Sequence, residues 1–236
     1  MIELINIKKN FGKTEVLKDI SIQLAAGQCI GLIGPNACGK TTMIKSILSM
    51  VIPTSGEILF NGKNIIGDVA YKNHIGYMPQ IGRYPENMSI SQVINMIKNI
   101  RKYNGQIDDE LWYAFGLDGV SDKKMRTLSG GTTQKVSATL AFLFNPDILI
   151  LDEPTAGLDP LAAEVLRDKI IKERKKGKLI LITSHLLNEL DELLSHVIFM
   201  QEGEIVLYKT IGDLYTETGE VKISKAIGNL LKSTLK

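Results

Sequence analysis

The chain has 236 residues, 44% of them hydrophobic and 23% charged, and its 28 basic and 26 acidic residues leave a net charge of +2. This composition is typical of a globular protein and excludes disordered, collagen-like and disulfide-stapled chains. The length suits one domain with a modest subdomain, and the balanced charge gives no reason to expect a nucleic-acid partner.

The N-terminal segment lacks the basic and apolar regions of a secretory signal, and no stretch reaches the roughly 18 apolar residues that span a bilayer. The two cysteines, Cys29 and Cys38, fit free thiols in a reducing compartment better than a disulfide. We therefore expect a cytoplasmic protein that is not secreted and does not itself cross the membrane.

Apolar and polar residues alternate at the start of the chain, which predicts half-buried strands, and an apolar run ending in glycine then predicts a buried strand. Apolar residues at helical spacing follow the glycine-rich loop, until Pro53 to Gly56 breaks the pattern. The elements expected here are strands at Ile2 to Ile7, Asp19 to Leu24 and Gln28 to Ile33, a helix at Lys40 to Met50, and strands at Glu57 to Phe60 and Ile75 to Met78.

Helical signals replace the strands between Ile81 and Leu128. Ser89 is a suitable helix cap and precedes apolar residues at helical spacing, and Asp108 to Phe115 predicts a second helix. This region is expected to be a helical insertion.

The rest of the sequence alternates helices and apolar strands, which is typical of a parallel α/β sheet. The expected elements are a helix after Ser129 that reaches Phe144, a strand at Ile148 to Leu151, a helix at Leu161 to Lys176, a strand at Leu179 to Thr183, a helix at Leu186 to Leu194 and a hairpin at Val197 to Tyr208. The amphipathic C-terminal segment, Glu220 to Lys236, either docks on its own domain or forms a regulatory or partner-binding tail.

The loop before the first helix carries the strongest chemical signal. Its residues match G-x-x-x-x-G-K-[ST] between a strand and a helix, a pattern that binds nucleotide phosphates. Glycines let backbone N–H groups point at phosphate oxygens, Lys40 reaches the β- and γ-phosphates, and Thr41 ligates Mg²⁺. A bare glycine turn would not require that lysine and that hydroxyl. The sequence predicts ATP and Mg²⁺ at Gly34, Pro35, Asn36, Ala37, Cys38, Gly39, Lys40, Thr41 and Thr42.

A pair of acids forms the second signal, at the end of the apolar strand in ILILDEP. In a phosphate-loop protein Asp152 would hold Mg²⁺ through its water shell, and Glu153 would orient or deprotonate the attacking water. The alternative is that two acids simply cap a strand end, which is less favoured beside a phosphate loop.

The segment Leu128 to Gln134, LSGGTTQ, resembles the signature of ATP-binding-cassette (ABC) ATPases, and with the loop and the acid pair the resemblance covers essentially the whole chain. It implies an α/β P-loop NTPase: a RecA-like core with an N-terminal antiparallel β subdomain and an inserted helical subdomain. A single domain, 1–236, would then comprise a nucleotide-binding core at 1–80 and 135–210, a helical subdomain with the signature at 81–134 and a C-terminal helical tail at 211–236.

Physical chemistry gives the signature a role of its own. Ser129 is placed to cap a helix, and the backbone of Gly130 and Gly131 would aim the helix dipole and N–H donors at an anion. A capped helix with only a structural role is the alternative.

The same resemblance implies roles for four further residues. Phe11 stands where the family stacks adenine, although a core phenylalanine explains it equally well. Gln80, in YMPQ, would contact Mg²⁺ and water, and His185, in LITSH, would contact the γ-phosphate. Asp159 would communicate across a cassette dimer, or it only caps the helix that begins at Pro160. Together with Lys40 and Glu153, Gln80 and His185 make up the predicted catalytic set.

The resemblance also implies partners. Two copies would pair head to tail, with the loop of one copy facing Ser129 to Gly131 of the other, and hydrolysis would drive a separate membrane permease that holds the protein at the inner face of the membrane. The segment Ile81 to Lys98 would form the permease groove. A soluble cassette protein for ribosome or DNA work would usually show two cassettes or a long coiled coil, and this sequence shows neither. A P-loop kinase is less favoured because it would not explain the LSGGT motif. A nucleotide-dependent assembly scaffold stays open.

A finer resemblance concerns IGYMPQIGRYPENMSISQVI and LSGGTTQKV, which are similar to the ATPase that partners an exporter-type permease in maturing the copper site of nitrous oxide reductase. The scattered cysteines and histidines and the unpaired methionines indicate that copper does not bind this chain directly.

Two loop residues depart from the family pattern, which usually has glycine at position 37 and alanine or serine at position 38. If Ala37 adopts a positive φ, alanine costs about 1–2 kcal/mol, so either the loop bends differently or phosphate affinity is weakened. Cys38, near a helix N-terminus and Lys40, is either a reactive thiol or a small packed side chain.

Overall fold

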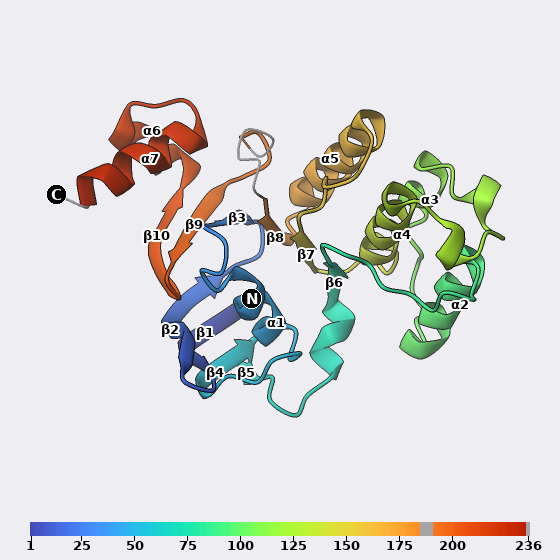
Figure 1. The fold of residues 1–236 in the computed structure, drawn as a ribbon, viewed down its shortest axis with the longest axis horizontal. Coiled ribbons are helices and arrows are strands. Elements are labelled where there is room, and N and C mark those ends of the chain that lie inside the picture. Colours follow the sequence, from blue (N-terminus) through green and yellow to red (C-terminus); the bar gives the residue numbers. More distant parts are fainter. Residues whose placement is uncertain (185–190, 235–236) are drawn as a thin grey trace.

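The computed structural model describes residues 1–184 and 191–234, and it contains two β-sheets with helices packed around the larger one (Figure 1). This arrangement confirms the predicted α/β class. Within the described residues, no helix is long and apolar enough to cross a membrane.

The smaller, N-terminal sheet is antiparallel, with the strand order β2-β1-β4-β5. Ile2, Leu4 and Ile7 are buried while the residues between them are not, as expected for a sheet with one solvated face. Asn61 and Gly62 both have positive φ and form the tight turn into β5. The strands are β1 (Ile2–Phe11), β2 (Thr14–Leu24), β4 (Ser55–Phe60) and β5 (Lys63–Asn64).

The larger sheet has the strand order β10-β9-β3-β8-β7-β6 and is parallel except for the β9–β10 hairpin. Its three central strands are buried along their whole length, which explains their continuous apolar sequences. The strands are β3 (Cys29–Ile33), β6 (Ile75–Met78), β7 (Ile148–Asp152), β8 (Leu179–Thr183), β9 (His196–Gln201) and β10 (Glu204–Thr210).

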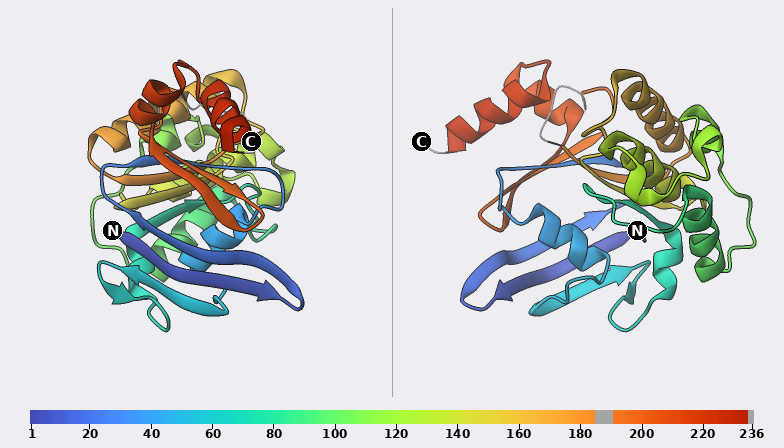
Figure 2. Two further views of the ribbon diagram at one scale, coloured as in Figure 1. Left: turned by 90° about the vertical axis from the view of Figure 1, so that its left-hand side faces the viewer. Right: turned by 45° about the vertical axis from the view of Figure 1, so that its right-hand side comes forward.

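Each face of this sheet is covered by a different layer. One face packs with α1 (Lys40–Ile47) and the N-terminal sheet in a single apolar cluster. The other face packs against α4 (Gly130–Phe142), α5 (Pro160–Lys175) and the C-terminal helices. Figure 2 shows these layers on opposite sides of the sheet. Because the central strands are parallel, their carboxyl ends lie at the same edge of the sheet, which is where ligands bind in such folds.

The predicted helical insertion lies beside β6 and has an apolar cluster of its own. It contains α2 (Ile90–Arg101), α3 (Glu110–Ala114) and 3₁₀ turns at Asp118–Val120 and Met125–Thr127. A further 3₁₀ turn, Ala70–His74, lies before β6. Ser89 caps α2 as predicted: its side chain accepts from the Gln92 N–H, and the Gln92 side chain accepts from the Ser89 N–H. The predicted boundary between residues 134 and 135 falls inside α4, whose side chains enter both the insertion cluster and the core.

The C-terminal tail forms two helices, α6 (Ile211–Thr218) and α7 (Ile223–Thr234), separated at Gly219, which has a φ of 68°. Ile223, Ala226 and Ile227 are buried in the core cluster. The tail therefore docks on its own domain.

Several element boundaries differ from the sequence prediction. The first strand runs past Ile7 to Phe11, and the second begins at Thr14, five residues before Asp19. The first helix ends at Ile47, three residues before Met50. The helix expected at Leu186 to Leu194 falls mostly outside the described residues, and Asp191 to Leu193 form a turn. The C-terminal helix begins at Ile223 instead of Glu220, after the turn at Gly219.

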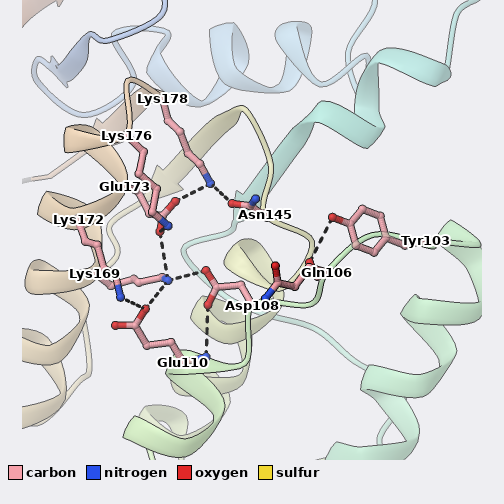
Figure 3. A network of polar contacts seen from close by, with 10 residues as sticks. All are labelled: Tyr103, Gln106, Asp108, Glu110, Asn145, Lys169, Lys172, Glu173, Lys176 and Lys178. Carbon is pink, nitrogen blue, oxygen red and sulfur yellow. Dashed lines mark hydrogen bonds and ion pairs between the residues drawn. The ribbon is translucent and has the colours of Figure 1, made fainter.

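A buried ion-pair cluster joins the insertion to α5 (Figure 3). The Lys169 ammonium lies 2.5 Å from an Asp108 carboxylate oxygen, 2.8 Å from one of Glu110 and 3.2 Å from one of Glu173, and the Lys169 and Glu173 side chains are 1% and 0% exposed. Lys176 and Lys178 also contact Glu173, at 2.7 and 2.5 Å. Burial alone would lower the pKa of Lys169, but its hydrogen bonds to the two insertion carboxylates raise it.

Candidate nucleotide-binding site

The phosphate loop runs from the end of β3 to the start of α1, and its shape depends on two glycines. Gly34 has a φ of 152°, and a Cβ there would lie 2.1 Å from the Met200 carbonyl oxygen. Gly39 has a φ of 109°, and its Cβ would lie 2.9 Å from the Val16 carbonyl oxygen. No larger residue fits at either position without moving the backbone of a neighbouring strand.

Lys40 is held across the loop. Its side chain is 9% exposed, and its ammonium donates to the carbonyl oxygens of Gly34, at 2.7 Å, and Pro35, at 3.0 Å. These bonds place a positive charge inside the curve of the loop, where a lysine point charge is suited to phosphate oxygens.

The two unusual loop residues take opposite sides of the loop. Ala37 is exposed and has a φ of 61°, so the positive φ that would strain alanine is present. Cys38 is 3% exposed, with its sulfur 3.7 Å from the Lys40 ammonium, and a Gly34 Cβ would touch that sulfur. The packed-thiol reading thus fits Cys38. Burial, opposed by Arg174, raises the pKa of the other thiol, Cys29, to about 12.

The acid pair stands at the end of β7, with Asp152 7% and Glu153 9% exposed. Thr183, at the end of β8, pairs with Asp152 in the parallel ladder. Its hydroxyl donates to Asp152 Oδ1 at 2.5 Å and accepts from the Glu153 N–H at 3.0 Å. Burial, together with the Asp152 charge, raises the pKa of the neighbouring Tyr77 to about 12, so that its phenol stays neutral.

One cleft of about 630 Å³ brings together Phe11, most of the predicted loop residues, Gln80 and the acid pair, while Gly34 and Pro35 do not line it. It lies at the carboxyl edge of the sheet, and its walls come from the N-terminal sheet, the phosphate loop, the segment after β6 and the ends of β7 and β8. The lining residues are Phe11, Thr14, Val16, Asn36, Ala37, Cys38, Gly39, Lys40, Thr41, Thr42, Gln80, Asp152, Glu153 and Thr183.

Phe11 occupies the outer part of this cleft. Its ring is 52% exposed, with the Lys9 ammonium 4.9 Å from the ring centroid. The reading of Phe11 as a core residue is therefore wrong. An exposed ring beside a phosphate loop suits stacking on a base, which stays a prediction.

The signature residues lie outside this cleft. Ser129 caps α4 by accepting from the Thr132 N–H at 3.2 Å, and a Cβ on Gly131 would lie 2.8 Å from the Gly157 carbonyl oxygen. Asp159 caps α5 by accepting from the Ala162 N–H at 2.9 Å. The signature helix thus packs on the loop that precedes α5.

Lys135 strengthens that contact, with its ammonium 2.7 Å from Asp159. This hydrogen bond, followed by that from the Ala162 N–H, lowers the pKa of Asp159. The helix-cap reading of Asp159 is correct, and its role between copies stays a prediction. His185 lies outside the described residues.

Sequence reasoning missed two polar contacts of this region. Thr183 appeared only as the end of a strand, and Lys135 only as a helix residue. The sequence signal for Thr183 was its place at the end of an apolar strand, directly before Ser184 and His185, while its pairing with the strand that carries the acids is seen only in the structure.

The residues fit the predicted ligands. The loop leads directly into the N-terminus of α1, whose backbone N–H groups can bind phosphate oxygens, and Lys40 supplies a positive charge beside it. Thr41 and Asp152 offer the hydroxyl and carboxylate oxygens that Mg²⁺ prefers.

Comparisons with known proteins agree with this geometry. The ABC transporter family matches residues 17–156. A lantibiotic transport ATP-binding protein of Streptococcus pyogenes is 31% identical, over 89% of this chain and 90% of that protein. A Nod factor export ATP-binding protein of Cupriavidus metallidurans is 30% identical, over 86% of this chain and 69% of that protein.

Two solved structures share the fold. An ATP-binding subunit of an ABC transporter has a TM-score of 0.89 at 25% identity, over 98% of this chain and 99% of that one. A dimeric ATP-binding cassette in a post-hydrolysis state, bound to ADP and phosphate, has a TM-score of 0.79 at 22% identity, over 89% and 99%.

Proposed function

The chain belongs to the ABC transporter family, and from this premise we propose that it is the ATPase that drives a separate membrane permease, acting with a second copy of itself. The observation that carries the proposal is the convergence of Lys40, Asp152 and Glu153 in one cleft. A phosphate-binding lysine and two buried acids at the edge of a parallel sheet are the arrangement that ATP hydrolysis needs.

Each side chain has a distinct task in this proposal. The loop N–H groups and Lys40 bind the phosphates, while Phe11 stacks on the base. Thr41, Gln80 and Asp152 would hold Mg²⁺, which neutralises charge on the phosphate oxygens when it is bound. Glu153 orients or deprotonates the attacking water, and His185, outside the described residues, would contact the γ-phosphate.

The second copy completes the site. Ser129 and Gly130 are exposed, and the capped N-terminus of α4 presents backbone donors suited to an anion. In a head-to-tail pair these donors would reach the γ-phosphate held by the partner's loop. ATP then joins the two copies and hydrolysis releases them, which turns chemistry into motion.

The transport role rests on the family and on the insertion. Relatives at 30–31% identity are named for lantibiotic transport and Nod factor export, which favours an exporter. Ile81, directly after Gln80, is 70% exposed and begins the segment expected to form the permease groove. The permease would hold this chain at the inner face of the cell membrane. Copper-site maturation of nitrous oxide reductase is the finer proposal, supported by the IGYMPQ and LSGGTTQKV segments.

Phosphate release tests the enzymatic part. The wild-type protein should release phosphate from ATP with Mg²⁺, and Glu153→Gln should abolish most of that release while ATP still binds. Equal, negligible release from both proteins would favour the nucleotide-dependent scaffold.

Complex formation tests the transport part. The chain mixed with the permease encoded beside it should co-purify, and replacing exposed Ile81 by Asp should weaken the complex without changing thermal stability. A permease preparation that never retains the chain would contradict this part of the proposal.

A further inference from the structure

The end of β8 places one hydroxyl between the two acids of the cleft. Thr183 is 1% exposed, and its hydroxyl is hydrogen-bonded both to the Asp152 carboxylate and to the Glu153 backbone N–H. It lines the same cleft as Lys40 and Gln80. This position invites a role beyond strand packing.

The hydrogen bonds of this hydroxyl are directional. A threonine oxygen has one proton to donate and two lone pairs to accept with. Because the Glu153 N–H occupies a lone pair at 3.0 Å, the single proton of Thr183 is directed to Asp152 Oδ1, at 2.5 Å. A carboxylate accepts and never donates, so the Asp152 contact admits only this orientation.

The backbone at Glu153 needs such a support. Glu153 has a φ of 52°, a conformation that costs a non-glycine residue free energy and persists only where neighbours enforce it. Its N–H is shared between the Thr183 hydroxyl and the Thr183 carbonyl oxygen, at 3.0 and 3.2 Å. Both acceptors belong to one residue, so β8 fixes the turn that directs the Glu153 side chain.

We propose that Thr183 is a positioning residue for ATP hydrolysis, whose hydroxyl sets the Asp152 carboxylate and the Glu153 turn relative to each other. This inference rests on the proposed function. Thr183 itself touches neither nucleotide nor water in this scheme. It acts by keeping the metal-holding acid and the water-orienting acid in one geometry.

Replacing the hydroxyl while keeping the shape tests this role. Thr183→Val has nearly the same volume and removes both hydrogen bonds, whereas Thr183→Ser keeps them. Misplacement of catalytic groups by about 1 Å lowers rates by about 100-fold, so we expect kcat of Thr183→Val to fall between about 10- and 100-fold. Thr183→Ser should stay within about threefold of wild type, and KM for ATP should change little in either variant.

A matched control separates positioning from the loss of any buried hydroxyl. Thr139 on α4 is 0% exposed, and its hydroxyl donates to the Lys135 carbonyl oxygen at 2.9 Å, away from the cleft. Thr139→Val should keep wild-type kcat. Binding of a fluorescent ATP analogue, titrated with Mg²⁺, gives a readout besides turnover: Thr183→Val should require severalfold more Mg²⁺ than Thr183→Ser.

The outcomes are decisive. A Thr183→Val protein with kcat within twofold of wild type overturns the inference, as does an equal loss in Thr183→Val and Thr183→Ser. If Thr183→Val does not fold, Thr183→Cys, with a weak thiol donor of similar size, takes its place under the same criteria. A wild-type protein that releases no more phosphate than Glu153→Gln refutes the proposed function instead, and the Mg²⁺ titration still tests Thr183.

Discussion

The Lys169 cluster makes a quantitative prediction for stability. Lys169→Met removes a side chain that is 1% exposed and that contacts three carboxylates from two parts of the chain. Removing one partner from a buried ion pair costs about 3–5 kcal/mol. Because Lys176 and Lys178 remain on Glu173, we expect a cost at the lower end, about 3 kcal/mol.

Thermal unfolding measures this cost. In a domain of this size each kcal/mol shifts Tm by about 2–4 °C, so Lys169→Met should lower Tm by about 6–12 °C. Lys172→Met is the matched control, because its side chain is 55% exposed and its ammonium pairs only with Glu110, at 2.8 Å, among the described contacts. Exposed pairs contribute about 0–1 kcal/mol, so the control should change Tm by less than about 4 °C.

Equal unfolding temperatures for Lys169→Met and Lys172→Met would contradict this prediction. Such a result would mean that Asp108 and Glu173 gain compensating contacts once Lys169 is absent. A rise in Tm for Lys169→Met would mean that desolvation of the charges exceeds their attraction, as it does in some buried clusters.

Three further predictions concern other sites. Ala37→Gly relieves a left-handed strain of about 1–2 kcal/mol and should tighten ATP binding by up to about tenfold in a fluorescence titration; unchanged or weaker binding would contradict this. Because Cys38 is packed and 3% exposed, a maleimide should label it slowly in the folded protein and rapidly in urea; rapid labelling of Cys38 in the folded protein would contradict the packed-thiol reading. Burial would raise the pKa of Glu173, but hydrogen bonds from Lys176 and Lys178 lower it to about 2 from 4.5. The ionised Glu173 carboxylate therefore contributes its full stabilisation above about pH 4.5 and loses it as the pH falls towards 2. The free energy of unfolding in urea should be lower at pH 3 than at pH 7, and this difference should be smaller in Glu173→Gln.

The parts of the site that were predictable are those written in short contiguous segments. The loop from Gly34 to Thr42 and the pair Asp152 and Glu153 each combine a strand end with polar residues at fixed spacing, so local sequence identifies them. The same holds for Ser129, whose capping pattern predicts a helix start.

The parts that were not predictable depend on the register between distant segments. Thr183 meets the acids because β8 pairs with β7 so that Thr183 lies opposite Asp152, and no local pattern encodes that pairing. Lys169 reads as a surface residue of an amphipathic helix, yet it is buried by carboxylates 59 and 61 positions earlier in the chain. Phe11 was ambiguous for the same reason, since its exposure depends on how the two sheets pack.

The packing of α4 also bears on the proposal that a second copy completes the site. Its middle is shared between two apolar clusters, with Ala138 and Phe142 in the core and Val136 in the insertion, and its start is held on the loop before α5 by the Lys135–Asp159 ion pair. These contacts fix Ser129 at the surface, outside the cleft that contains Lys40. Moving it into its own cleft would break both clusters, whereas a second copy supplies the same residues without any such cost. If Ser129 of one copy binds phosphate held by the other, the total rate of phosphate release should therefore rise with the square of protein concentration when the protein is dilute, and the rate per molecule should rise in proportion to concentration.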